Sequence, residues 1–312
     1  MYSALAGAGA GASVSDTESD LTPATHPMTT TRGILLIDCP DRKGIVAAVS
    51  EFLYRHHANI LHADQHQDAE RSLFLMRVEW ELTGFEFDLD EFPARFADIA
   101  GRFEMRWRLE RSDRPHRVAL FVSKYDHCLA DLLYRHQSGE LACDIPLVIG
   151  NHPDAERWAD FYGVPFFHVP VTPATKAEGE ARQLALLADH GVDLVVMARY
   201  MQVLSADFVA RYPHRVINVH HSFLPAFSGA KPYHRAFERG VKLIGATSHY
   251  ATQDLDEGPI IEQDVVRISH RDELDDLIRK GRDLEKVVLS RAVRWHLDHR
   301  VLVYDRKTVV FD

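Results

Sequence analysis

The sequence predicts an α/β protein of two domains: a small β-α-β-β-α-β unit, then an open, mostly parallel sheet with helices on both faces. Three observations predict this class. The chain has 312 residues, 46% of them hydrophobic, which is enough for two cores of ordinary size. Residues 111–115 are polar and broken by proline, which is typical of a linker. After this linker, short apolar runs alternate with helical stretches, as buried parallel strands and their covering helices do.

The small domain is predicted over residues 32–112. Its first helix follows from Ile45, Val46, Val49, Phe52 and Leu53, which recur at helical spacing on one face. The expected order is strand 33–38, helix 45–53, strand 59–68, strand 73–80, helix 92–99 and strand 103–109. This order is the ferredoxin-like arrangement.

The larger domain is predicted over residues 116–312. Its parallel strands are expected at 118–122, 145–149, 165–169, 194–197 and 216–219, with helices between them, including 129–136 and 175–190. Two strands at 243–250 and 259–268, a helix at 274–297 and a hairpin of 301–304 and 308–311 follow. Gly281 is expected to allow a break in that last helix. Ligands of such sheets bind beyond the carboxyl ends of the strands.

Charge and cysteine content narrow the partners and the compartment. The net charge of −10 argues against nucleic acid as the main partner. The three cysteines, Cys39, Cys128 and Cys143, form no C-x-x-C pair, so neither a disulfide framework nor a zinc site is expected, and a reducing cytoplasm fits best. No apolar run reaches membrane-spanning length, so no membrane partner is expected.

The first residues of the chain are rich in Ala, Gly, Ser and Thr. They fit neither a secretory signal nor a mitochondrial transit peptide, because they lack early basic residues and contain acidic ones. We therefore expect residues 1–31 to be a flexible tail.

Polar side chains that can act on an acyl group gather at two predicted strand ends. Asn218 and His220 are two residues apart on one strand, so both point to the same face. Asp256 lies in a loop bounded by Gly258 and Pro259. An isolated histidine or aspartate of this kind is more often structural, but an amide donor, an imidazole and a carboxylate together favour acyl hydrolysis or transfer.

These residues lie in motifs that resemble the folate-dependent formyltransferases. The motifs are Asn218-x-His220 followed by Ser222-Phe223-Leu224-Pro225, and Leu255-Asp256-Glu257-Gly258-Pro259 downstream. The resemblance implies a formyltransferase fold, 10-formyltetrahydrofolate as substrate without a tightly bound cofactor, no metal, and Asn218, His220 and Asp256 as the catalytic trio. Asn218 and a protonated His220 can stabilise an oxyanion, while Asp256 holds the imidazolium, organises a water or shuttles its proton; the division of its role stays open.

The resemblance also implies a folate pocket around the trio. It assigns the folate to two segments, Met201, Gln202, Val203 and Leu204, and Thr252, Gln253, Asp254 and Leu255. His249, His221 and Ser123 are expected to support the pocket.

One departure from the amine-specific members concerns the formyl acceptor. Glycinamide ribonucleotide transformylases have a glycine-rich turn after the first strand of this domain, where backbone N–H groups can hold a phosphate. Residues 122–129 contain no glycine. Residues 116–312 instead resemble the formyltetrahydrofolate deformylases, in motifs that include Ala198-Arg199-Tyr200-Met201 and Gly281-Arg282-Asp283. That resemblance implies water as acceptor and tetrahydrofolate and formate as products.

The small domain resembles ACT domains through residues 38–46 and 58–60. The resemblance implies an amino-acid effector, methionine or glycine, with Gly44 and Asn59 as candidate ligands, and a homo-oligomer formed through paired ACT sheets. Gly44 can equally serve to free the start of a helix.

Three other functions compete with deformylation as interpretations of the sequence. A formyltransferase acting on a sugar-nucleotide amine or an aminoacyl-tRNA is the nearest alternative, although an acidic chain without a basic extension argues against tRNA. A non-catalytic amino-acid sensor is disfavoured because the whole trio is present. A dinucleotide-dependent dehydrogenase is disfavoured because no G-x-G-x-x-G follows a predicted strand.

Overall fold

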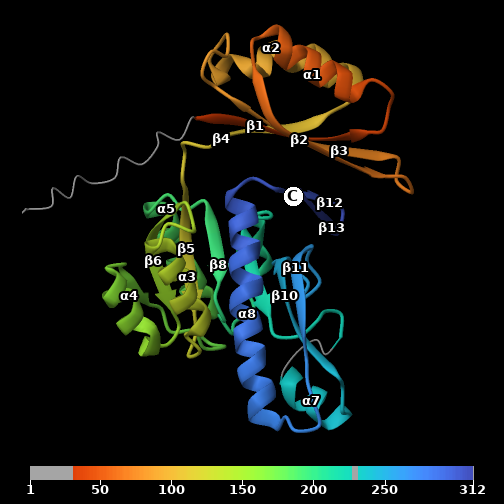
Figure 1. Cartoon of the computed structure of the whole chain (residues 1–312). Coiled ribbons are helices and arrows are strands. Elements are labelled where there is room, and N and C mark those ends of the chain that lie inside the picture. Colours follow the sequence, from red (N-terminus) through yellow and green to blue (C-terminus); the bar gives the residue numbers. More distant parts are fainter. Residues whose placement is uncertain (1–30, 227–230, 312) are drawn as a thin grey trace, which may run out of the picture. The chain divides into compact units, whose positions relative to one another are not determined.

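A computed structural model describes residues 31–226 and 231–311 of the chain. The tail predicted for residues 1–31 lies, apart from its last residue, outside the described residues. The described residues form a four-stranded sheet and a seven-stranded sheet, each packed against helices, and a C-terminal two-stranded hairpin (Figure 1).

The first sheet is antiparallel, with strand order β2-β3-β1-β4. Its elements are β1 (Arg32–Pro40), α1 (Ile45–Arg55), β2 (Asn59–Asp68), β3 (Leu73–Glu81), α2 (Phe92–Phe103) and β4 (Arg106–Arg111). This confirms the predicted β-α-β-β-α-β order. The last strand starts later than predicted, because Phe103 ends α2 and Glu104 caps it in a left-handed conformation. Both helices pack on one face of the sheet, over a core that includes Trp80, Phe92 and Phe96.

The second sheet has seven strands in the order β11-β10-β9-β8-β5-β6-β7. Its strands are β5 (His116–Val122), β6 (Cys143–Gly150), β7 (Phe166–His168), β8 (Leu194–Met197), β9 (Val216–His220), β10 (Leu243–Tyr250) and β11 (Ile260–Arg267). The five strands from β9 to β7 are parallel, and β10 and β11 extend the sheet in antiparallel pairing. The predicted class, an open and mostly parallel sheet, is confirmed.

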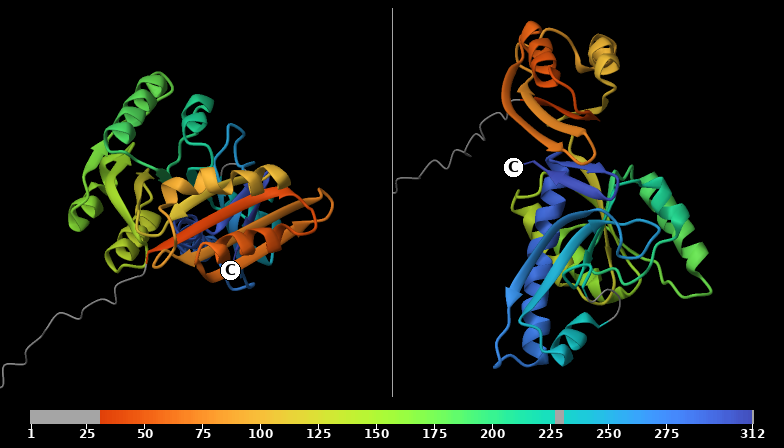
Figure 2. Two further views of the ribbon diagram at one scale, coloured as in Figure 1. Left: turned by 90° about the horizontal axis from the view of Figure 1, so that it is seen from above. Right: turned by 90° about the vertical axis from the view of Figure 1, so that its right-hand side faces the viewer.

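Helices cover both faces of this sheet (Figure 2). They are α3 (His127–Gln137), α4 (Glu156–Tyr162), α5 (Lys176–Asp189), α6 (Ala206–Arg211), α7 (Pro232–Arg239) and α8 (Leu274–Leu297). Alternate residues of β5 belong to different cores. Val118 and Leu120 pack with α3, α4 and α8, whereas Ala119 and Phe121 pack with α5 and α6. Because both faces are buried, the strands are apolar throughout rather than alternating.

Helix α8 runs without interruption past Gly281, so the break expected there is wrong. The glycine instead makes room for a neighbouring side chain. A Cβ at Gly281 would lie 2.2 Å from the ring and hydroxyl of Tyr233, which comes from α7. Close packing, not a kink, therefore accounts for this residue.

The chain ends in the predicted hairpin, β12 (Val301–Tyr304) and β13 (Lys307–Val310). Leu302 and Tyr304 share a small core with Ile34 and Leu36 of the first sheet. All three cysteines are buried and free. No helix within the described ranges is both long and apolar enough to cross a membrane.

Candidate active site

Asn218 and His220 lie at the carboxyl end of β9, near the middle of the seven-stranded sheet. Both side chains line one pocket of about 240 Å³, as their spacing on a strand predicts. His220 is 5% exposed. The site thus lies beyond the strand ends, where open α/β sheets bind their ligands.

Strand β10 delivers His249 to the same place. It runs antiparallel to β9 in a register that sets His249 opposite Asn218. On its other side, the pairing of β10 with β11 shifts register between Ser248 and His249. Irregularities of this type turn a side chain and are frequent next to active sites.

The loop between β10 and β11 carries Asp256. Its backbone has φ = 57°, a left-handed conformation that is uncommon for a residue with a side chain. The Asp256 carboxylate is 7% exposed, and its Oδ2 lies 3.2 Å from His220 Nδ1. The contact uses Nδ1 of the ring. The other ring nitrogen, His220 Nε2, is buried and has no hydrogen-bond partner among the described residues.

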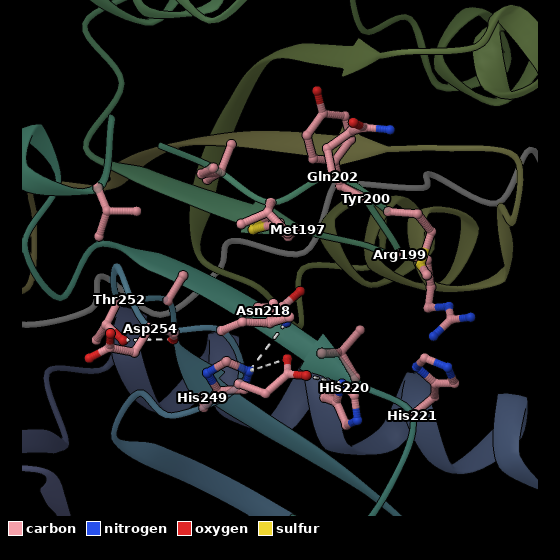
Figure 3. Close-up of a pocket in the computed structure, with 18 residues that line it drawn as sticks. Met197, Arg199, Tyr200, Gln202, Asn218, His220, His221, His249, Thr252 and Asp254 are labelled. Atoms are coloured by element: carbon pink, nitrogen blue, oxygen red, sulfur yellow. Dashed lines mark hydrogen bonds and ion pairs between the residues drawn. The ribbon is translucent and has the colours of Figure 1, made fainter. Parts of the chain in front are cut away.

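His249 fixes the orientation of Asn218. Its Nδ1 donates to the Tyr250 carbonyl at 3.0 Å, so its Nε2 accepts from Asn218 Nδ2 at 3.2 Å in the neutral ring. Burial lowers the pKa of His249, which keeps this ring neutral. Its Nε2 also lies 3.9 Å from Asp256 Oδ1. Figure 3 shows these side chains converging, with dashed lines between them.

The Ser-x-Leu-Pro segment after β9 serves to hold the strand end in place. Thr247 donates its hydroxyl to the Ser222 carbonyl at 2.8 Å and accepts from the Leu224 N–H at 3.0 Å. Gln263 donates to the Leu224 carbonyl at 2.9 Å. The segment is therefore tied to β10 and β11, which carry the other half of the site.

Most of the predicted pocket residues line the same cavity as the trio. They are Met201, Gln202, Val203, Leu204, Thr252, Asp254, Leu255, His221 and His249. Two others do not line it. Gln253 is exposed, and Ser123 lies behind the pocket, where its hydroxyl accepts from the Met201 N–H at 2.9 Å and donates to Asn151 at 2.7 Å. Ser123 thus holds the backbone of Met201 from outside the pocket.

The two candidate ACT ligands lie in the first sheet domain and not in this pocket. Gly44 caps α1 with φ = 93°, and an added Cβ would meet nothing within 4 Å. Asn59 starts β2 and donates its amide to Glu81 at 3.0 Å.

Sequence reasoning did not assign four further residues next to the trio, which we call the Arg199 cluster: Arg199, Glu285, His127 and Tyr233. Glu285 accepts from Tyr233 at 2.7 Å, pairs with His127 Nε2 at 2.7 Å and lies 3.4 Å from Arg199 Nε. Burial opposes ionisation of Glu285, but the hydrogen bond from His127 and the charge of Arg199 outweigh it and lower its pKa. The Ala198-Arg199-Tyr200 motif after β8 was the available signal for Arg199.

His221 connects the Arg199 cluster to the trio. Its ring lies 5.0 Å from that of His220 and 5.9 Å from that of Tyr233, measured between centroids. Burial, together with the charges of Arg199 and His220, lowers the pKa of His221 to about 3. His221 is therefore neutral near pH 7 and does not add to the positive charge of Arg199.

One group in the described part of the chain has the residue types of a metal site. His127, Cys128 and Glu285 offer ligand atoms within 4.8 Å of one another. Burial raises the pKa of the Cys128 thiol well above its usual range, and the Glu285 oxygens already accept from Tyr233 and His127. A protonated thiol and a committed carboxylate beside a guanidinium do not suit a cation.

Comparisons with known proteins agree with this geometry. Residues 116–293 match the model of the formyl transferase family, and residues 33–92 match the ACT domain. Formyltetrahydrofolate deformylase of Synechocystis is 58% identical over 277 residues, which cover 89% of this chain and 97% of that protein. The chain belongs to the formyltetrahydrofolate deformylase family.

Solved structures with two different names are similar to this chain. A formyltetrahydrofolate deformylase from Pseudomonas syringae is 52% identical and superposes with a TM-score of 0.89, covering 91% of this chain and 96% of that one. A glycinamide ribonucleotide transformylase from Symbiobacterium toebii is 30% identical with a TM-score of 0.60, over 64% of this chain and 95% of that one. The deformylase family therefore shares its catalytic fold with enzymes named for a ribonucleotide substrate.

Proposed function

We propose that this chain hydrolyses 10-formyltetrahydrofolate to tetrahydrofolate and formate, with Asn218, His220 and Asp256 as the catalytic residues. One observation carries the proposal: the buried His220–Asp256 pair beside Asn218, in a pocket that contains the motifs of a deformylase family. An imidazole backed by a carboxylate, next to an amide donor, suits the attack of water on a formyl carbon.

The reaction needs an oxyanion site and a path for protons. The water oxygen bonds to the formyl carbon, and the negative charge that develops on the formyl oxygen is stabilised by Asn218 Nδ2 and by His220 Nε2–H. Asp256 organises the water and accepts its proton. The C–N10 bond then breaks, N10 takes a proton, and formate leaves.

The folate lies in the apolar part of the pocket in this proposal. Met201, Val203 and Leu255 are 50%, 50% and 60% exposed, although they are apolar and line the cavity. Exposed apolar side chains around a pocket are suited to cover a flat heteroaromatic ring. Reduced folate is a substrate here, and no tightly bound cofactor is proposed.

Water is favoured over a phosphorylated amine by the amino end of α3. The turn before this helix contains Asp126, whose carboxylate accepts from Trp158 and Arg157 at 2.7 Å each. The Asp126 carboxylate at this helix end already occupies the Arg157 guanidinium, so that cation is not free to pair with a phosphate there.

The test of this function is formate release from 10-formyltetrahydrofolate without any amine. Stoichiometric tetrahydrofolate and formate are expected, measured by absorbance and by a coupled formate assay. If the folate is consumed only after an amine is added, and no formate is released, hydrolysis is refuted and formyl transfer is favoured.

We also propose that residues 32–112 form a regulatory ACT domain and residues 116–312 the catalytic domain, in a cytoplasmic homo-oligomer. In this view methionine or glycine binds the ACT domain near Gly44 and Asn59, and the formate produced supplies purine synthesis and balances the one-carbon pool.

Regulation predicts that methionine or glycine changes the rate of formate release, whereas leucine does not. The variant Asn59→Ala should shift the effector concentration that gives half of the maximal change in rate. The rate without effector should stay the same, because Asn59 lies outside the active-site pocket. A rate that no amino acid alters would refute this part of the proposal.

A further inference from the structure

The pocket ends on one side at a buried charged cluster that the proposed reaction does not use. In Figure 3, Thr252 and Asp254 lie at one end, Asn218 and His220 lie between, and Arg199 lies beside His221 at the other end. Arg199 is 8% exposed and lines the pocket. Behind it, Glu285 is 1% exposed and holds Tyr233 and His127.

The position of Arg199 has a cost in free energy. Its Nε and Nη1 are buried without a hydrogen-bond partner in the described residues, although Nε lies within 3.4 Å of Glu285 Oε2. Its backbone is left-handed, with φ = 64°. A buried, incompletely paired guanidinium and a strained backbone each destabilise a fold, and such features persist mainly at functional sites.

We propose that the Arg199 side chain, anchored by Glu285, fills the place from which an amine would reach the formyl carbon, and thereby restricts the acceptor to water. The inference rests on the proposed function. Thr252 and Asp254 lie at the end of the pocket away from Arg199, while Gln202 lies along one side near Tyr200. The acceptor in this proposal approaches the trio from the end where Arg199 and His221 lie. Water needs far less room than a substituted amine.

A hydrolase of this kind must keep amines away from the formyl carbon, because an amine is a better nucleophile than water. In transfer, the amine nitrogen bonds to the formyl carbon, the C–N10 bond breaks, the amine loses a proton and N10 gains one. The same trio could catalyse this step, since the transformylase similar to this chain shares its fold. Specificity then requires an element that rejects the wrong acceptor, and a side chain in its path is such an element.

The variant Arg199→Gly tests the proposal, because glycine adopts a left-handed backbone without strain and leaves the space open. Protein and 10-formyltetrahydrofolate are incubated with hydroxylamine, glycinamide or glycinamide ribonucleotide, and formate and N-formyl product are quantified by mass spectrometry. We expect the wild-type chain to give formate, and the variant to raise the ratio of N-formyl product to formate by about tenfold or more.

Two matched variants separate space from other effects. Arg199→Met keeps most of the volume without the charge, so it should remain a hydrolase. Arg282, like Arg199, lies over the Tyr125 ring, but it does not line the pocket. Its guanidinium carbon is 5.3 Å from the ring centroid, compared with 5.6 Å for Arg199. The variant Arg282→Ala therefore removes a similar arginine from outside the pocket. Its product ratio should equal that of the wild type.

A folded Arg199→Gly variant that still yields formate alone would overturn the proposal, and so would an Arg199→Met variant that transfers as well as Arg199→Gly. If Arg199→Gly does not fold, the double variant Arg199→Gly/Glu285→Gln, which also removes the buried carboxylate, decides by the same ratio. Failure of both to fold would mean that Arg199 is a stability element, which also overturns it. Failure of the proposed function is distinct, because the wild-type chain would then release no formate.

Discussion

Replacement of His220 by alanine is expected to lower kcat for formate release by about 10²- to 10⁴-fold, the range typical of a lost acid–base or oxyanion-stabilising group. His220 Nε2 is buried without a partner among the described residues and lines the pocket, while Asp256 holds its Nδ1 at 3.2 Å. Because the lost interaction forms mainly in the transition state, kcat should fall far more than KM changes. Initial rates across folate concentrations measure both constants.

His221→Gln is the matched control for this prediction. The two histidines are neighbours in sequence and their rings lie 5.0 Å apart. The pKa of His221 lies at about 3, so this ring transfers no proton near neutral pH. We expect its replacement to cost about tenfold or less. A His220→Ala variant that is folded and as active as His221→Gln would remove His220 from the mechanism.

Replacement of Gly258 by alanine is expected to destabilise the protein by about 1–3 kcal/mol, the usual range for overpacking, and to reduce activity as well. A Cβ at this position would lie 1.7 Å from the Tyr250 carbonyl oxygen. That oxygen belongs to backbone at the end of β10, so it cannot move aside as a flexible side chain would. The added methyl group must therefore displace the loop that contains Gly258 and Asp256.

Gly101→Ala provides the control, because nothing lies within 4 Å of a Cβ there and the residue is inside α2. It should be neutral or stabilising by up to about 1 kcal/mol, since alanine favours the helix. Urea denaturation, with kcat measured in parallel, compares the two. Equal midpoints for both variants would contradict the packing argument for Gly258.

The part of the site that could be predicted consists of residues close together on one element. Asn218 and His220 follow from the alternation of a strand, and their place at its carboxyl end follows from the rule for open sheets. The strand order and the longer helices also follow from apolar periodicity, because burial on one or two faces imposes a repeat on the sequence. The short helix α7, between β9 and β10, was not predicted.

Contacts between residues far apart in the sequence could not be predicted from periodicity. The 3.2 Å contact of His220 with Asp256 depends on the pairing of β10 with β9 and on a left-handed residue in the following loop. The break expected at Gly281 was wrong for a similar reason: helix propensity describes the residue, whereas the space it leaves is filled by Tyr233 from another helix.

By itself, then, the sequence determined the fold class, the family motifs and the strand end that bears Asn218 and His220, because each of these is encoded in local periodicity or in a contiguous motif. The tertiary structure alone decided that His249 orients Asn218, that Ser123 accepts from the Met201 N–H, and that Arg199 lies beside Glu285. These arrangements join residues from separate strands and helices, and close packing of those elements, which no local pattern records, sets their distances.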